Sequence, residues 1–265
     1  MGRDHPETIS PTAHYTGYVW FAHGHSHEAF ATSQGRMMYR ALRGPNAVAQ
    51  ALGLATLEGM LLARHRLIDL RLTQAIERGE ISQVIEIAAG LSPRGWRLTR
   101  QFPALRYLEA DLPRMVEHKR ALLAKAGATH QVVALDALAE SALDDLVATL
   151  DPGQGTAIIT EGLVNYFDRA TVAAMWTRFA RALSRFRRGV YYSDVMLRDT
   201  NSDLLTNTFG SLLSVFVRGK VHVHDGVDDA LRTAGFAAAL LDPRDFFTDI
   251  DRAGAAKVRI IEAEA

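Results

Sequence analysis

From residue 82 to its end, the chain alternates short apolar segments with longer segments of helical spacing. The candidate strands are residues 83–88, 105–110, 131–135, 156–160, 189–193 and 257–262, and the candidate helices are residues 112–126, 138–150 and 169–187. Strands that alternate with helices of this length are typical of βαβ units, which build a largely parallel sheet with helices on its faces. The sequence therefore predicts an α/β fold.

The first 79 residues carry no strong strand pattern, and we expect them to form a helical arm or cap on a sheet domain of residues 80–265. Apolar residues recur at helical spacing over residues 47–76, which predicts one long helix there. Residues 15–38 are rich in aromatic residues and histidine and are expected to cover the sheet rather than join it. Residues 201–217 are expected to add a helix over the sheet's edge. We expect the arm and the sheet domain to form one compact unit.

The charge balance and the missing residue types exclude several classes of protein. The 265 residues hold 30 basic and 30 acidic side chains and no cysteine. A chain without surplus basic charge is unlike proteins whose binding to nucleic acid depends on phosphate contacts. No apolar run approaches the roughly 20 residues that span a bilayer, and no secretory signal is visible. We expect a cytoplasmic protein whose partner is a small molecule, with no nucleic acid, membrane or metal, and self-association into a homo-oligomer stays open.

The turn after the first strand, residues 86–94, is where a parallel sheet would bind a ligand. A dinucleotide-binding turn needs G-x-G-x-x-G, but Ala88 and Pro93 stand at the first and third glycine positions, which disfavours NAD and FAD. S-adenosylmethionine (SAM) carries no phosphate and needs one close backbone approach, which Gly90 can provide. Asp111 ends the second strand, where a carboxylate can accept hydrogen bonds from two ribose hydroxyls. The alternative interpretation is structural, with Gly90 permitting a tight turn and Asp111 capping the next helix.

Several segments resemble one family of enzymes. Residues 84–98 (VIEIAAGLSPRGWRL) and 107–113 (YLEADLP), with Lys119, resemble motifs of the leucine carboxyl methyltransferase family, and most closely its bacterial branch of polyketide O-methyltransferases. Residues 63–69 (ARHRLID) resemble the helix before the family's first strand, and residues 160–167 (TEGLVNYF) resemble its signature after the fourth strand. The resemblance implies a Rossmann-like class I methyltransferase fold, with a mostly parallel seven-stranded sheet and an N-terminal helical cap.

The resemblance also implies a set of residues that hold SAM. Arg64 would reach the methionyl carboxylate, Gly90 would pass under the methionine part, and Asp111 would hold the ribose. Asp136 with Ala137 would face the adenine, and Glu161 would lie beside the methionyl ammonium or the transferred methyl group. The predicted cofactor-binding residues are Arg64, Glu86, Gly90, Arg94, Asp111, Asp136, Ala137 and Glu161. The chain departs from the family at residues 92–94, where Asp-Thr-Arg is usual, and at Ala88, where glycine is usual; Arg94 remains to contact an anion.

The acceptor and the catalytic base are less well marked. Tyr15, Tyr18 and Tyr166 are predicted to contact the substrate, although the aromatic residues near Tyr18 are equally compatible with a core. His224 is a candidate base that the pattern favours less than a structural histidine at a strand end. Alternate histidines at positions 23, 25 and 27 share one face of an extended segment, but no nearby Asp or Cys completes a metal site.

The predicted function is SAM-dependent transfer of a methyl group to a hydroxyl or carboxylate of a small molecule, in polyketide biosynthesis if the branch is right. The alternative is a regulatory or scaffold protein that binds SAM or a nucleoside without transferase activity, which the altered residues 92–93 motivate. Replacing Glu161 by Gln is expected to weaken SAM binding and to change the melting temperature little.

Overall fold

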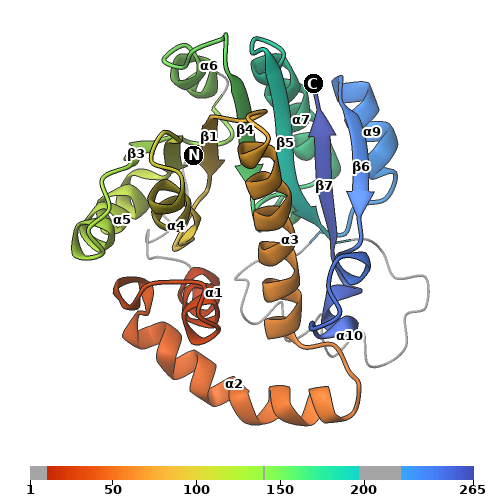
Figure 1. Cartoon of the computed structure of the whole chain (residues 1–265). Helices are drawn as coiled ribbons and strands as arrows, with labels where there is room; N and C mark the ends of the chain where they lie inside the picture. Colours follow the sequence, from red (N-terminus) through yellow and green to blue (C-terminus); the bar gives the residue numbers. More distant parts are fainter. Residues whose placement is uncertain (1–10, 140, 197–221) are drawn as a thin grey trace, which may run out of the picture.

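The computed structural model describes residues 11–139, 141–196 and 222–265, so the helix expected at residues 201–217 lies outside the described residues. One sheet of seven strands in the order β3-β2-β1-β4-β5-β7-β6 forms the centre of the molecule (Figure 1). Its strands are β1 (Gln83–Ile87), β2 (Arg106–Asp111), β3 (Gln131–Ala134), β4 (Gly155–Thr160), β5 (Arg188–Val195), β6 (Ala237–Leu241) and β7 (Arg259–Glu264). Each of the six predicted strands is present within two residues of its expected bounds.

The first five strands pair in parallel, with β1 between β2 and β4. β7 runs antiparallel between β5 and β6, which forms the edge. The predicted α/β fold with a mostly parallel seven-stranded sheet is therefore confirmed, with antiparallel pairing at one side. The sequence pattern misses β6, because its residues Ala-Ala-Ala-Leu-Leu include no β-branched or aromatic side chain that would distinguish a strand from a helix.

Helices cover both faces of the sheet. The helices of the described residues are α1 (Pro11–Ala22), α2 (Ser33–Ala51), α3 (Leu57–Glu77), α4 (Arg94–Gln101), α5 (Pro113–Lys125), α6 (Ala142–Val147), α7 (Arg169–Leu183), α9 (Val227–Ala234) and α10 (Arg252–Ala255). Successive side chains of a strand point to opposite faces, so Ile85 packs into the core under α7 and α9, whereas Val84 packs into the core under α3. Figure 1 shows α3 crossing one face and α7 and α9 lying behind the sheet.

The helix predicted over residues 47–76 is wrong as a single element, because the chain breaks between α2 and α3. Gly53 has a φ of +68°, a conformation that ends a helix and favours glycine. Thr56 then caps α3, its side chain accepting a hydrogen bond from the backbone N–H of Gly59 at 2.9 Å. Helical spacing persists across the break and hides these two local signals.

The N-terminal helices share a core with the sheet. Tyr15 and Val19 of α1 are fully buried in the same apolar cluster as Leu67 of α3 and Ile159 of β4. The division into an arm of residues 1–79 and a domain of residues 80–265 stays a prediction. Within the three described ranges, no helix has the length and apolar character to cross a membrane.

Candidate functional site

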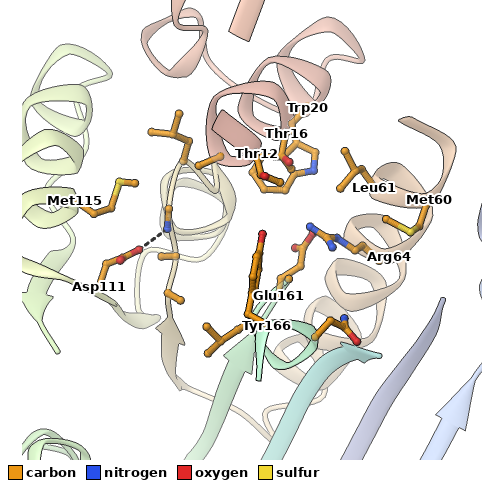
Figure 2. Close-up of a pocket in the computed structure, with 18 of the residues that line it drawn as sticks. Thr12, Thr16, Trp20, Met60, Leu61, Arg64, Asp111, Met115, Glu161 and Tyr166 are labelled. Atoms are coloured by element: carbon orange, nitrogen blue, oxygen red, sulfur yellow. Dashed lines mark hydrogen bonds and ion pairs between the residues drawn. The ribbon is translucent and has the colours of Figure 1, made fainter. Parts of the chain in front are cut away.

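A cavity of about 340 Å³ lies at the carboxyl ends of β1, β2 and β4 (Figure 2). Most of its wall comes from four parts of the chain: Thr12, Thr16 and Trp20 of α1, Met60, Leu61 and Arg64 of α3, residues 88–91 after β1, and residues 161–163 and 165–167 after β4. Asp111 at the end of β2 and Met115 of α5 line the remaining side. Concave sites of this size at the carboxyl ends of parallel strands are where α/β proteins bind small ligands.

Backbone hydrogen bonds form one end of the cavity. The Asp111 carboxylate accepts a hydrogen bond from the N–H of Gly90 at 2.7 Å, the dashed line in Figure 2, and one from the N–H of Leu112 at 2.8 Å. Gly90 has a φ of +50°, and a Cβ placed on it would come no closer than 3.9 Å to another residue, so the backbone leaves open space for a ligand. Burial raises the pKa of Asp111 above its usual value, with the two N–H groups opposing the shift.

The buried Lys119 ammonium supports this turn from below. It donates hydrogen bonds to the carbonyl oxygens of Gly90 at 3.1 Å and Ser92 at 2.6 Å, and it lies 2.8 Å from the carboxylate of Glu109. Ala88, in the same turn, is the one non-glycine residue with a positive φ, +55°, among the described residues. The chain thus keeps the left-handed turn although alanine replaces the glycine that the family usually has there.

Buried charges form the other end. Glu161, with 4 % of its side chain exposed, accepts hydrogen bonds from Arg64 Nε at 3.1 Å and from Arg94 at 2.5 Å, and it lies 2.8 Å from His65 Nδ1. Its neighbours His65, Arg94 and Arg64 hold the pKa of Glu161 well below its usual range in spite of burial. Such a carboxylate stays ionised and is a weak base.

Arg64 connects this end to a carboxylate that is not among the predicted site residues. It donates from Nη1 to Asp194 of β5 at 3.2 Å, and Asp194 also accepts the N–H of Gly162 at 2.5 Å. Burial raises the pKa of Asp194, while Arg64 opposes the shift. Arg64 therefore lines the cavity with two carboxylates already beside its guanidinium group.

Arg94 lies outside the cavity wall, in contact with Glu161 of that wall. It is fully buried and donates to Glu86 at 2.5 Å and to Asp69 of α3 at 2.5 Å, besides Glu161. Asp69 also pairs with Arg97. Glu86 in turn accepts a hydrogen bond from the Tyr107 hydroxyl at 2.7 Å. These contacts tie α3 to the turn after β1 and to the end of β4.

The predicted site residues therefore separate into two groups. Arg64, Gly90, Asp111, Glu161 and Tyr166 line the cavity. The others lie outside its wall: Glu86 and Arg94 are buried, Tyr15 is in the core, Tyr18 packs against Tyr39, Ala137 packs against the core under α7, and Asp136 is exposed. The Asp136 side chain accepts the N–H of Leu138 at 2.9 Å, which ends a local turn. Their assigned roles stay predictions.

The cavity also contains residues that sequence reasoning misses. Thr12, Thr16 and Met60 carry no motif, and their place in the wall depends on how α1 and α3 pack against each other. Asp194 had a usable signal, because an acid directly after the buried segment Tyr191–Tyr192–Ser193 ends a parallel strand at the ligand edge. His65 and Asp69 are four residues apart on α3, a spacing that places both side chains on one helix face.

The histidines of the N-terminal segment have separate neighbours. His23 pairs with Glu58 at 2.5 Å, His27 accepts the N–H of Ala29 at 3.1 Å, and the His25 ring lies 6.4 Å from that of His65. Across the part of the chain that the structure describes, no group of His, Cys, Asp and Glu is placed to hold a metal ion. His224 lies outside the cavity wall and its Nε2 is 3.3 Å from the carbonyl oxygen of Val164.

Comparison with known proteins places the chain among methyltransferases. The family model of leucine carboxyl methyltransferase matches residues 21–180. A protein of Mycolicibacterium paratuberculosis (strain ATCC BAA-968 / K-10), named as a candidate S-adenosyl-L-methionine-dependent methyltransferase, is 39 % identical over 112 residues, which are 40 % of this chain and 35 % of the relative. The match thus spans about a third of that relative's length.

Two solved structures share the fold over nearly the whole chain. A candidate methyltransferase from Thermobifida fusca YX is similar with a TM-score of 0.66 at 15 % identity, over 99 % of this chain and 98 % of the other. A DUF574 family protein from Streptomyces avermitilis MA-4680 gives a TM-score of 0.64 at 13 % identity, over 97 % of each chain. At these identities the likeness establishes the fold.

Proposed function

The chain belongs to the leucine carboxyl methyltransferase family, and on that premise we propose that it transfers a methyl group from SAM to a hydroxyl or carboxylate oxygen of a small molecule. The observation that carries the proposal is the composition of the cavity. Its two ends are polar and differ in kind, a carboxylate held by backbone amides at Asp111 and a buried charge network at Arg64 and Glu161. The wall between them and under α1 is largely apolar.

The residues at the two ends suit the two ends of SAM. Asp111 has both carboxylate oxygens fixed by N–H groups, and further lone pairs remain to accept the ribose hydroxyls. Met115 lies beside Asp111 (Figure 2) and offers a polarizable surface to an aromatic base. Arg64 would face the methionyl carboxylate and Glu161 the ammonium group. Bound there, SAM supplies a methyl group already activated by its sulfonium.

The acceptor would bind against α1 and α3. Thr16, Met60 and Leu61 line this part of the wall, and the Tyr166 ring stands between Asp111 and Arg64 in the view of Figure 2. The described wall offers a poor choice of base, because Glu161 is held ionised by its hydrogen-bonded neighbours, Arg64 and Arg94 among them, and Asp111 already accepts two backbone N–H groups. We therefore favour an acceptor oxygen that arrives ionised, such as a carboxylate or an acidic phenol, which the chain needs only to orient and to shield from water.

Ligand binding and turnover test the proposal separately. A ligand that binds only the folded state raises the melting temperature, so SAM and S-adenosylhomocysteine should raise it and NADH should not. Incubation with SAM and a panel of carboxylic acids, phenols and alcohols should then give a product heavier by one methylene group in mass spectrometry. Binding of SAM without transfer to any acceptor would favour the regulatory alternative, and no shift with SAM would overturn the proposal.

The pH dependence of transfer distinguishes the acceptor classes. If the chain supplies no base, kcat/KM should follow the ionisation of the acceptor itself, so a carboxylic acid should give a profile that is flat from about pH 6 to 9. A second ionisation near neutrality with the same carboxylic acid would show that a side chain such as a histidine takes part.

A further inference from the structure

Helix α2 carries the most exposed apolar side chains of the described chain. Met37, Val48 and Leu52, the last just beyond the helix end, are 67 %, 61 % and 68 % exposed, more than any other large apolar residue that the structure describes. Figure 1 shows α2 at the edge of the molecule, away from the sheet and beside α1. Isolated exposed apolar residues are common on proteins, but three on one helix form a surface that needs an explanation.

These residues lie in one stripe. Positions 37, 41, 44, 48 and 52 are separated by four, three, four and four residues, a spacing that keeps side chains on one face of a helix. The stripe consists of Met37, Ala41, Gly44, Val48 and Leu52, and we call it the outer stripe. The opposite face carries Met38, Tyr39 and Leu42, which pack against the core shared by α1 and α3. The outer stripe is therefore additional to the apolar face that the fold uses.

A row of arginines borders the outer stripe. Arg36, Arg40 and Arg43 follow one another at four and three residues, are exposed, and make no ion pair with any residue in the described ranges. The 19 residues of α2 include no Asp or Glu. On α7 and just after it, by contrast, the exposed Arg181 and Arg185 both pair with Asp144. An apolar stripe beside a cationic row that has no acidic partner among the described residues is typical of helices that lie in the plane of a membrane interface.

We propose that the outer face of α2, its apolar stripe and its three arginines, docks on an anionic lipid surface. The stripe would enter the boundary between headgroups and acyl chains, and the arginines would contact lipid phosphates. A second copy of the chain is the other possible occupant of this face. Its own α2 would bring no acidic group to the arginines, so charge complementarity favours an anionic lipid surface. The sequence contains no apolar run long enough to span a bilayer, but docking on the surface of a membrane does not require one.

The consequence for the cavity follows from the packing of α2. It rests on α1, which supplies Thr12, Thr16 and Trp20 to the cavity wall. Docking would hold the acceptor side of the cavity one helix away from the lipid surface, while the residues of the charge network and of the Asp111 turn take no part in it. The proposal is thus independent of the proposed methyl transfer.

Cosedimentation of the full chain with vesicles tests the proposal. We expect binding to phosphatidylcholine vesicles that contain about 30 % phosphatidylglycerol, weak binding to pure phosphatidylcholine, and loss of binding in about 0.5 M NaCl. The triple variant R36Q/R40Q/R43Q should bind the anionic vesicles more than about tenfold less well. The pair V48S/L52S should weaken binding without removing its salt dependence, because it changes only the apolar stripe.

The matched control removes three exposed arginines elsewhere. R181Q/R185Q/R232Q changes the net charge by the same amount, on α7, just after α7 and on α9, where these residues are 63 %, 50 % and 72 % exposed, and it should bind like the parent. An equal loss of vesicle binding in both triple variants would show that binding depends on net charge alone, and it would overturn the proposal. So would absence of binding by the parent, or a dimer in light scattering that V48S/L52S dissociates, because the face would then be covered by a second copy. Circular dichroism should show all variants folded.

Discussion

The two ends of the cavity hold their ligand-facing carboxylates in different ways. Asp111 is fixed by two backbone N–H groups that come from its own turn and from the turn after β1. Glu161 is fixed by side chains from α3 and from α4, which lie 67 to 97 residues earlier in the chain. A carboxylate held by the backbone depends on local conformation, whereas one held by charged side chains depends on the correct packing of several elements. The position of Asp111 should therefore tolerate substitution of neighbouring side chains, whereas the position of Glu161 should not.

The largest effect should come from Arg94→Met. The substitution removes a fully buried cation and leaves Asp69, Glu86 and Glu161 without their shared partner. Removal of one member of a buried ion pair destabilises a protein by about 3–5 kcal/mol, so we expect a loss of this order in urea denaturation.

The reference for this prediction is Arg71→Met, which breaks the half-exposed pair with Glu262. A pair of that exposure contributes about 1 kcal/mol or less. Equal losses in the two variants would show that the buried network is no more important to the fold than a surface ion pair, and the distinction between the two ends would fail.

Glu161→Gln should come next, and here the structure changes the expectation from the sequence. A Gln at this position leaves Arg64, His65 and Arg94 without a shared negative charge, so the ligand-free protein should lose about 1.5–3 kcal/mol rather than keep its melting temperature. Because the folded-state pKa of Glu161 lies below its usual value of 4.5, its stabilisation is present above that pH and is lost as pH falls below it.

The measurement is the free energy of unfolding of parent and variant between about pH 3 and 7. The difference between parent and E161Q should be largest at the upper end and shrink below pH 4.5. E262Q, which alters the half-exposed pair with Arg71, provides the matched control and should show a small difference throughout. A difference that is constant with pH would place the effect of E161Q in packing rather than in charge.

Asp111→Ala tests the backbone-held end. If Asp111 holds the ribose, its loss should weaken SAM binding by about tenfold or more, since hydrogen bonds to a charged group contribute about 1.5–3 kcal/mol each. Isothermal titration with SAM measures the effect, and urea denaturation should show a smaller change in stability than for Arg94→Met. The comparison variant is D136A, which removes an acid that also follows a strand but is exposed and outside the cavity wall, and we expect it to weaken SAM binding less than D111A does. If D136A weakens binding as much as D111A, Asp136 contacts the adenine as the family resemblance implies.

The difference between the backbone-held carboxylate and the side-chain-held carboxylate also explains which site residues could be predicted from the sequence. Gly90 and Asp111 are predictable because both follow strands, and the strands are marked by apolar runs such as Val84–Ile87. Arg94 is visible as a motif residue, but its place outside the cavity wall follows from the position of Asp69 on α3, which strand and helix patterns do not give. Tyr15 was a candidate for contact with the substrate because it lies in an aromatic-rich segment. The structure buries it in the apolar core, because α1 packs against α3. Asp194 was not predicted to belong to the site, because its partner Arg64 is 130 residues away in the sequence.

The smallest expected effect is that of Ala88→Gly, at the backbone-held end. Ala88 has a φ of +55°, and the left-handed region costs a residue with a Cβ about 1–2 kcal/mol. Glycine adopts this conformation freely but loses about 0.5–1 kcal/mol more conformational entropy on folding than alanine, so the variant should be between about 0 and 1.5 kcal/mol more stable. Ala89→Gly is the matched control: its neighbouring alanine lacks the positive φ, so only the entropy term applies and stability should fall by about 0.5–1 kcal/mol. Urea denaturation of the two variants side by side measures the difference. Two equal losses would show that Ala88 is not strained, and the turn would then owe its shape to Lys119 and Asp111 rather than to tolerance of strain at its first residue.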